Sequence, residues 1–185
     1  MKILIIDNGS SYLNKIKEAI SDTSFDVEPF SNINLEKINN YDGVILSGGH
    51  DFPVIGNENK LAKEIELIEN INKPILGICF GFELIAHVYK SELARSKEKE
   101  KGILDLEIIQ NDPIFANISN LKVYESHRWI VKKVGEDLLA LAKSEDGIEV
   151  IKHKNRLIYG VQFHPEMLAD DTCDQTIIKN FLTLI

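Results

Sequence analysis

A cysteine stands between two glycines in the segment Gly-Ile-Cys-Phe-Gly, residues 77–81, directly after an apolar run. This is the G-x-nucleophile-x-G pattern of a nucleophile elbow, with cysteine in place of serine. The flanking glycines leave room for a tight turn from a strand into a helix. The helix N-terminus would favour the thiolate of Cys79, and the Phe80 N–H would face a developing oxyanion. A buried structural thiol is the competing interpretation, because free cysteine is among the most buried residue types.

The segment YGVQFHPE, residues 159–166, holds a candidate base and a group to orient it. Pro165 separates His164 from Glu166 and favours an extended conformation in the residue before it. Residues two apart in an extended segment project to the same side, so Glu166 could hold the imidazole of His164. His164 could then activate a thiolate, which is the nucleophile–base–orienter arrangement of covalent catalysis. Taken alone, a His-Pro-Glu sequence is more often a turn than a catalytic pair.

Two adjacent glycines lie in the segment LSGGHD, residues 46–51. Glycine lets the backbone approach a ligand closely, so the N–H of Gly49 is a second candidate donor to an oxyanion. The sequence Ser-Gly-Gly-x-Asp also opens the phosphate loop of ATP pyrophosphatases, but that loop continues with serine where this chain has Phe52. Neither GxxxxGK(S/T) nor GxGxxG occurs in the sequence, so we expect no nucleotide site and no cofactor.

The elements that must position these residues alternate along the first half of the chain. Short apolar runs at 2–7, 25–30, 41–49 and 73–79 predict strands, and apolar residues at helical spacing predict helices at 11–20, 60–72 and 82–89. This alternation is typical of an α/β fold with a mostly parallel central sheet and helices on both faces. Sites in such sheets lie at the carboxyl ends of the strands, where the candidate residues follow.

The second half of the chain changes character. The charge run SKEKEKG, residues 96–102, is interpreted as a solvated loop or hairpin tip. Several of the pieces that follow have period-two alternation and predict a smaller antiparallel strand region: 103–109, 121–127, 138–144, 148–154 and 157–166. Residues 173–185 predict a closing helix. No linker or repeat interrupts the pattern, so we expect a single domain over residues 1–185.

Composition narrows the class of protein. The formal net charge of −8 disfavours binding to nucleic acid or to an anionic membrane, since both need a positive face. No apolar run approaches the roughly 18–20 residues that cross a bilayer, and the start does not resemble a signal peptide, so we expect a cytoplasmic protein. Cys79 and Cys173 are the two cysteines, too few for a disulfide framework, and no cysteine–histidine spacing predicts a structural zinc or another metal site.

Five segments together resemble the class I (triad) glutamine amidotransferases, which have a flavodoxin-like architecture: LIIDNGSSY, GVILSGGH, PILGICFGFELIA, ESH and YGVQFHPE, in the order of that family. The resemblance implies that a cysteine attacks the side-chain amide of glutamine, forms a γ-glutamyl thioester and releases ammonia. It implies a triad of Cys79, His164 and Glu166, an oxyanion hole of Gly49 and Phe80, and contacts with the substrate from Glu83, Ser126 and His127.

Within the family, DNGSSY and ILSGG resemble the glutaminase subunits of two-subunit GMP synthetases, which supply ammonia for GMP synthesis from XMP. Amidotransferases of the anthranilate or aminodeoxychorismate type usually read more like DNYDSF and SPGPG, and they stay an alternative. The resemblance implies that glutamine is the substrate and that the partner is a separate ATP-pyrophosphatase synthetase subunit. A stand-alone hydrolase of γ-glutamyl amides or isopeptides and a non-catalytic member of the family are further alternatives.

Three residues depart from the family pattern. Glu83 stands where the family usually has glutamine, facing the α-amino group of the substrate, and its charge should oppose thiolate formation at Cys79. It could bind an ammonium group better than glutamine does, or it could mark a different substrate. His50 replaces a proline, and Trp129 stands where GMP-type subunits have an acidic residue that tends to face the synthetase.

Overall fold

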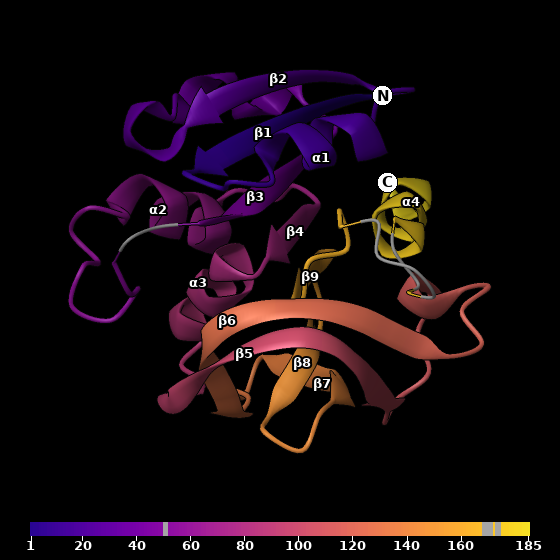
Figure 1. Ribbon diagram of the computed structural model, residues 1–185. Helices are drawn as coiled ribbons and strands as arrows, with labels where there is room; N and C mark the ends of the chain where they lie inside the picture. The colour runs from indigo at the N-terminus through magenta and orange to yellow at the C-terminus, as the bar shows by residue number, and fades with distance from the viewer. Residues whose placement is uncertain (50–51, 168–171, 173–174) are drawn as a thin grey trace.

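Figure 1 shows the computed structural model of the chain, which describes residues 1–49, 52–167, 172 and 175–185. His50 and Cys173 lie outside the described residues, as do the first two residues of the predicted closing helix. The helices are α1 Leu13–Ala19, α2 Ala62–Asn70, α3 Phe80–Val88 and α4 Thr176–Leu184. The strands are β1 Lys2–Asn8, β2 Ser24–Pro29, β3 Gly43–Gly49, β4 Ile75–Ile78, β5 Glu92–Ile108, β6 Leu121–Lys133, β7 Leu138–Lys143, β8 Ile148–His153 and β9 Ile158–Val161.

The strands of the described residues form one mixed sheet in the order β2-β1-β3-β4-β9-β8-β6-β5-β7. The pairings from β2 through β9 are parallel, and those that join β9, β8, β7, β6 and β5 are antiparallel. The prediction of an α/β fold is therefore confirmed. The prediction of a mostly parallel sheet with a smaller antiparallel region is wrong, because the antiparallel part includes the two longest strands.

The charge run at 96–102 explains that error. The sequence predicts a loop or hairpin tip there, but the run lies within the 17-residue strand β5. Lysine and glutamate alternate along it, and β5 pairs with β6 over most of its length, with a register shift between Arg95 and Glu100. One face of an antiparallel sheet can meet water, so charged side chains do not prevent a strand from forming. Figure 1 shows β5 and β6 as two long strands side by side.

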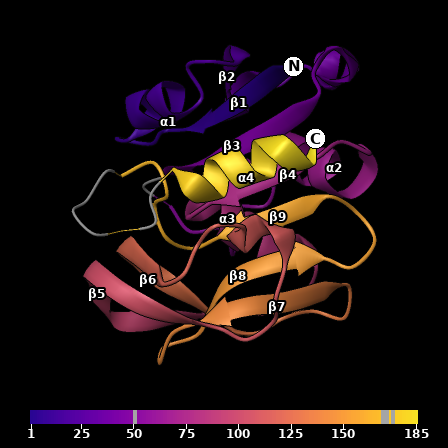
Figure 2. The same cartoon turned by 90° about the vertical axis from the view of Figure 1, so that its right-hand side faces the viewer.

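Helices cover both faces of the parallel half, as predicted. Side chains of β1 alternate between two apolar layers, with Ile3 and Ile5 in one and Leu4 and Ile6 in the other. The first layer includes residues of α1 and α4, and the second includes residues of α2 and α3. Figure 2 shows α1 and α4 beside the parallel strands. Strands that are buried on both faces read as continuous apolar runs, which is why these strands could be recognised in the sequence.

The predicted strands and helices of the first half have ends within two residues of those observed. The piece predicted at 157–166 is shorter, since β9 ends at Val161 and the chain then leaves the sheet. Because β1, β3, β4 and β9 are parallel neighbours, their carboxyl ends meet at one edge. The residues that follow them come together there. No helix among the described residues is long and apolar enough to cross a membrane.

Candidate active site

Cys79 lies at the turn between β4 and α3, in a conformation that side chains rarely adopt. Its φ is 50° and its ψ is −101°, so the residue is in the left-handed half of the Ramachandran plot. The backbone around it has no spare room. A Cβ built on Gly77 would lie 2.5 Å from the carbonyl oxygen of Gly81, and one built on Gly81 would lie 2.5 Å from that of Leu46. Both glycines are therefore needed for the turn that presents Cys79.

His164 and Glu166 follow β9 and are held together. His164 Nδ1 lies 2.9 Å from Glu166 Oε1, and their side chains are only 5% and 0% exposed. The backbone N–H of His164 donates to the carbonyl oxygen of Tyr124 over 2.9 Å, and the ring of Tyr12 meets the imidazole edge-on. The carboxylate thus fixes the orientation of the imidazole and leaves Nε2 as the nitrogen for proton transfer.

Gly48 lies between Cys79 and His164. A Cβ built on Gly48 would lie 3.2 Å from His164 Cε1 and 3.4 Å from Cys79 Cβ. The thiol and the imidazole therefore flank one small residue at the end of β3. The same two side chains line a cavity of about 320 Å³. The structure thus brings Cys79, His164 and Glu166 to one place from two separate strand ends.

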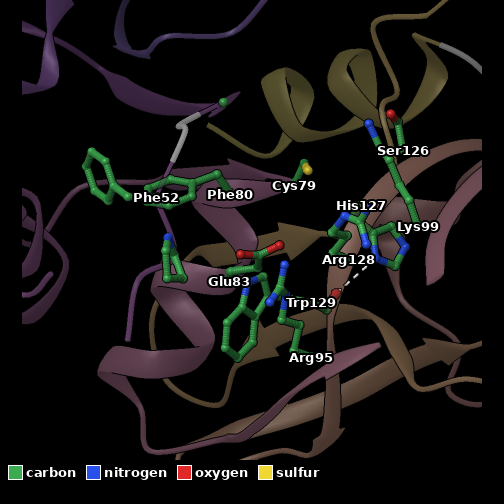
Figure 3. Close-up of a pocket in the computed structure, with 12 residues that line it drawn as sticks. Phe52, Cys79, Phe80, Glu83, Arg95, Lys99, Ser126, His127, Arg128 and Trp129 are labelled. Carbon is green, nitrogen blue, oxygen red and sulfur yellow. Dashed lines mark hydrogen bonds between the residues drawn. The ribbon is translucent and has the colours of Figure 1, made fainter. Parts of the chain in front are cut away.

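A second cavity, of about 400 Å³, is also lined by Cys79 (Figure 3). It shares Gly49, Lys99 and Ser126 with the first cavity. Phe80, Glu83 and residues 126–129 also line it, with Arg95 and Arg128 adding positive charge. All eight predicted site residues except Glu166 line at least one of the two cavities.

Phe80 and Gly49, the two residues predicted to form the oxyanion hole, both lie beside Cys79 at the edge of the cavities. A hydrogen bond from the Phe80 backbone N–H lowers the pKa of the Cys79 thiol, so this donor lies against the sulfur. Gly49 has a φ of 131°, and a Cβ there would collide with the backbone of Asn8 and Gly9. Asn8 is itself held by Ser47, whose hydroxyl accepts the Asn8 N–H over 2.9 Å.

The thiol of Cys79 is not poised as a thiolate. Burial raises its pKa well above the ordinary value, and the carboxylates of Glu83, Glu166 and Glu125 raise it further. The expectation that the helix N-terminus favours the thiolate is therefore overridden, although the predicted opposition from Glu83 is found. A thiol in this environment needs a base at the moment of attack, and His164 is the group beside it.

Gln162 is a site residue that the sequence analysis missed. Its Nε2 donates to Glu83 Oε1 over 3.4 Å and lies 3.9 Å from Cys79 Sγ. Burial raises the pKa of Glu83 to about 7, although His127 and the Gln162 amide both favour the charged form. Gln162 lies within the YGVQFHPE segment, but only the packing of β9 against α3 reveals its contact with Glu83.

His127 is held at both ring nitrogens. Its Nδ1 lies 2.9 Å from the carbonyl oxygen of Trp129 (dashed in Figure 3), and its Nε2 lies 2.8 Å from Glu125 Oε2. Burial disfavours the charged ring, but Glu125, Glu149 and Glu83 together raise the pKa of His127 to about 9. Trp129 lines the larger cavity and is half-buried.

The fold and this arrangement are those of a cysteine-dependent amidotransferase. The glutamine amidotransferase class-I family matches residues 4–185 of the chain. The chain therefore belongs to the class-I glutamine amidotransferases and is an enzyme of that class, which confirms the resemblance found in the sequence.

Among its relatives, the chain is similar to a protein from Pyrococcus abyssi that is named as a subunit of glutamine-hydrolyzing GMP synthase, with 36% identity over 98% of this chain and 97% of that protein. It is 35% identical to the protein of the same name from Pyrococcus furiosus, over 97% of this chain and 96% of that protein. A crystal structure from Thermoplasma acidophilum, of a protein provisionally named as the corresponding GMP synthase subunit, superposes with a TM-score of 0.88. That match has 28% identity and covers 100% of this chain and 93% of the other.

Proposed function

We propose that this chain is the glutaminase subunit of a two-subunit GMP synthetase. It hydrolyses glutamine to glutamate and ammonia and passes the ammonia to a separate ATP-pyrophosphatase subunit, which makes GMP from XMP. The names of the relatives support this assignment, since the chain matches them over nearly their full length. A single domain over residues 1–185 and a cytoplasmic location belong to the same proposal. The relatives give no support to a stand-alone γ-glutamyl hydrolase or to an anthranilate-type acceptor.

The observation that carries the chemistry is the 2.9 Å contact between His164 and Glu166 beside the Cys79 turn. His164 takes the thiol proton of Cys79 as the sulfur attacks the amide carbon of glutamine. The N–H groups of Gly49 and Phe80 stabilise the oxyanion that forms. The carbon–nitrogen bond then breaks, His164 returns the proton to the leaving nitrogen, and ammonia departs. Water, deprotonated by His164, cleaves the thioester and releases glutamate.

The larger cavity is the proposed place for the rest of the substrate. Glu83 is the candidate partner for the α-ammonium group, and Gln162 keeps its carboxyl near Cys79. Ser126 lies on the opposite wall, where the α-carboxylate would reach it, and His127, with both ring nitrogens engaged, would hold this stretch in place. Arg95 and Arg128 line the same cavity and would attract that carboxylate.

The test is glutamate release from glutamine by the full chain, beside Cys79→Ala, with and without a candidate synthetase subunit loaded with ATP and XMP. We expect weak activity that depends on Cys79 and increases at least about tenfold with the loaded partner. The partner assayed with ammonium chloride in place of glutamine checks that its own step works. Cys79-dependent hydrolysis that no XMP-activating subunit stimulates would leave a glutaminase but overturn the GMP assignment.

A further inference from the structure

Three ionisable side chains form a buried group behind the wall of the larger cavity. Glu125 and His127 are two residues apart on β6, so they project from the same face of that strand, and Glu149 lies on β8. Strands β6 and β8 are paired through Val131 and Ile148. One ligand atom from each of the three residues lies within 4.8 Å of the others. The residues are 0%, 4% and 1% exposed.

The inward-facing atoms of this group have no hydrogen-bond partner. They are both carboxylate oxygens of Glu125, Nε2 of His127 and Oε2 of Glu149. A buried carboxylate without a partner is costly, so such groups are normally paired or coordinate a metal. Among the salt bridges of the described residues, Glu125 contacts only His127, and none involves Glu149. No lysine or arginine in this part of the chain therefore balances the two carboxylates.

Glu125 and His127 lie in ion-pair contact within this group. Nε2 lies 2.8 Å from Glu125 Oε2, yet both atoms remain without a hydrogen-bond partner. Two ligand atoms of one metal ion lie side by side in this way.

The outward-facing atoms are fixed by other groups. His127 Nδ1 lies 2.9 Å from the carbonyl oxygen of Trp129, which requires a proton on Nδ1 and leaves Nε2 as the ring nitrogen that faces the carboxylates. Glu149 Oε1 accepts a 2.7 Å hydrogen bond from the hydroxyl of Ser144. That hydroxyl also accepts the backbone N–H groups of Asp146 and Gly147. Outer partners of this kind orient the ligands of metal sites in proteins.

We propose that Glu125, His127 and Glu149 bind a divalent first-row transition-metal ion, such as Zn²⁺ or Mn²⁺. One imidazole and two carboxylates suit such ions better than Ca²⁺ or Mg²⁺, which prefer oxygen ligands alone. Two ligand atoms of a tetrahedral zinc ion are about 3.4 Å apart, so any pair near the 4.8 Å limit must move closer when the ion binds. Glu100 faces His127 in the β5–β6 register and has one buried, unpartnered oxygen, so it is a candidate fourth ligand.

The ion would act on structure, not on the reacting bond. Residues 126–129 line the larger cavity opposite Cys79, and the backbone of this stretch is tied to the group through His127 and the Trp129 carbonyl. A metal that joins β6 to β8 would hold that wall in place. The ion has a path to the site because His127 itself lines the cavity. This inference is independent of which acceptor receives the ammonia.

The experiment is metal binding to the full chain after dialysis against EDTA. Zn²⁺ and Mn²⁺ are each titrated by calorimetry, and the bound metal is counted by mass spectrometry after gel filtration. We expect one equivalent to bind and to raise the melting temperature by several degrees. Glu125→Gln and Glu149→Gln should each weaken binding at least about tenfold. Glu136→Gln removes an exposed carboxylate elsewhere and should bind as the native chain does.

Circular dichroism and a melting curve show whether each variant is folded. A second measurement uses only the native chain, so it remains decisive if both cluster variants misfold. In an NMR titration, Zn²⁺ should shift the side-chain ¹⁵N resonance of Nε2 in one histidine. Nδ1 of the same histidine should keep its proton. A folded native chain that binds no metal at millimolar concentration would overturn the proposal. Protons on the side chains of the three residues would then neutralise the cluster. Binding that both cluster variants retain would overturn it as well.

Discussion

The backbone N–H of Glu83 donates to the carbonyl oxygen of Cys79 over 2.9 Å, which holds the buried Glu83 carboxyl one helical turn from the thiol. Glu83 follows burial as the second cause that raises the pKa of Cys79. Its own pKa is about 7, so it is largely charged above neutral pH, where the thiol would titrate. The nucleophile and a carboxylate that opposes its ionisation therefore belong to the same turn of α3.

Replacing Glu83 with glutamine should make Cys79 easier to ionise. The neutral amide keeps the shape of the side chain and removes the negative charge, so the pH midpoint of Cys79 alkylation by iodoacetamide should fall by about one unit. Alkylation rates across pH 6–10 measure this. Glu66→Gln, on the exposed side of α2, is the matched control and should leave the midpoint unchanged. An unchanged midpoint in Glu83→Gln would show that Glu83 is neutral or screened from the thiol.

Glu166→Gln should slow glutamine hydrolysis by about 10²–10⁴-fold in kcat, since the amide can orient His164 but cannot stabilise its charged form. KM should change little, because Glu166 lines neither cavity. Steady-state glutamate release measures both constants. Retention of kcat within about threefold would remove Glu166 from the triad. A melting curve is needed beside it, because Glu166 is fully buried.

Features formed by residues close together in the sequence could be predicted, whereas features formed by contacts between distant segments could not. The elbow at Cys79 and the His164–Glu166 pair are set by residues within a few positions of one another, so their patterns could be recognised. Gln162 contacts Glu83 on α3, and Glu149 lies beside Glu125 and His127 on β6. The spacing of residues in the sequence predicts neither contact. The fold shows the same limit. Apolar runs marked the strands buried on both faces, whereas the charged segment 96–102 of β5 was predicted to be a loop or hairpin tip.

Gly81→Ala tests the backbone packing under the nucleophile. Alanine favours a helix by about 1 kcal/mol over glycine, so propensity alone predicts a gain. Instead, the new Cβ would lie 2.5 Å from the Leu46 carbonyl oxygen and 2.8 Å from Leu46 Cβ, and α3 must move away from β3. We expect a loss of about 2–3 kcal/mol in urea unfolding and at least tenfold lower activity.

Gly43→Ala is the matched control for that substitution. Its new Cβ would meet only the tip of the Ile185 side chain within 3 Å, which can rotate away. It should therefore cost less stability than Gly81→Ala and leave glutamine hydrolysis intact. Equal losses in both variants would mean that the close approach of α3 to β3 has no special importance.

Glu64 gives the protein a stability that depends on pH. It is fully buried on α2, and burial raises its pKa to about 7, against the opposing hydrogen bond with Asn8. The folded state then holds this proton between the ordinary glutamate pKa and about pH 7, where the unfolded chain has released it. Its contribution to stability is complete below the unfolded-state pKa and is lost as the pH rises through the folded-state value.

Glu64→Gln removes that loss, because the amide never ionises. The variant should be more stable than the native chain at pH 8, by on the order of 3 kcal/mol, and the difference should shrink towards pH 5. Urea unfolding of both proteins at several pH values measures it, and Glu66→Gln on the exposed face of the same helix should show no such trend. A difference that stays constant from pH 5 to pH 8 would mean that Glu64 does not titrate in this range, and the gain would then come from packing or hydrogen bonding at Asn8.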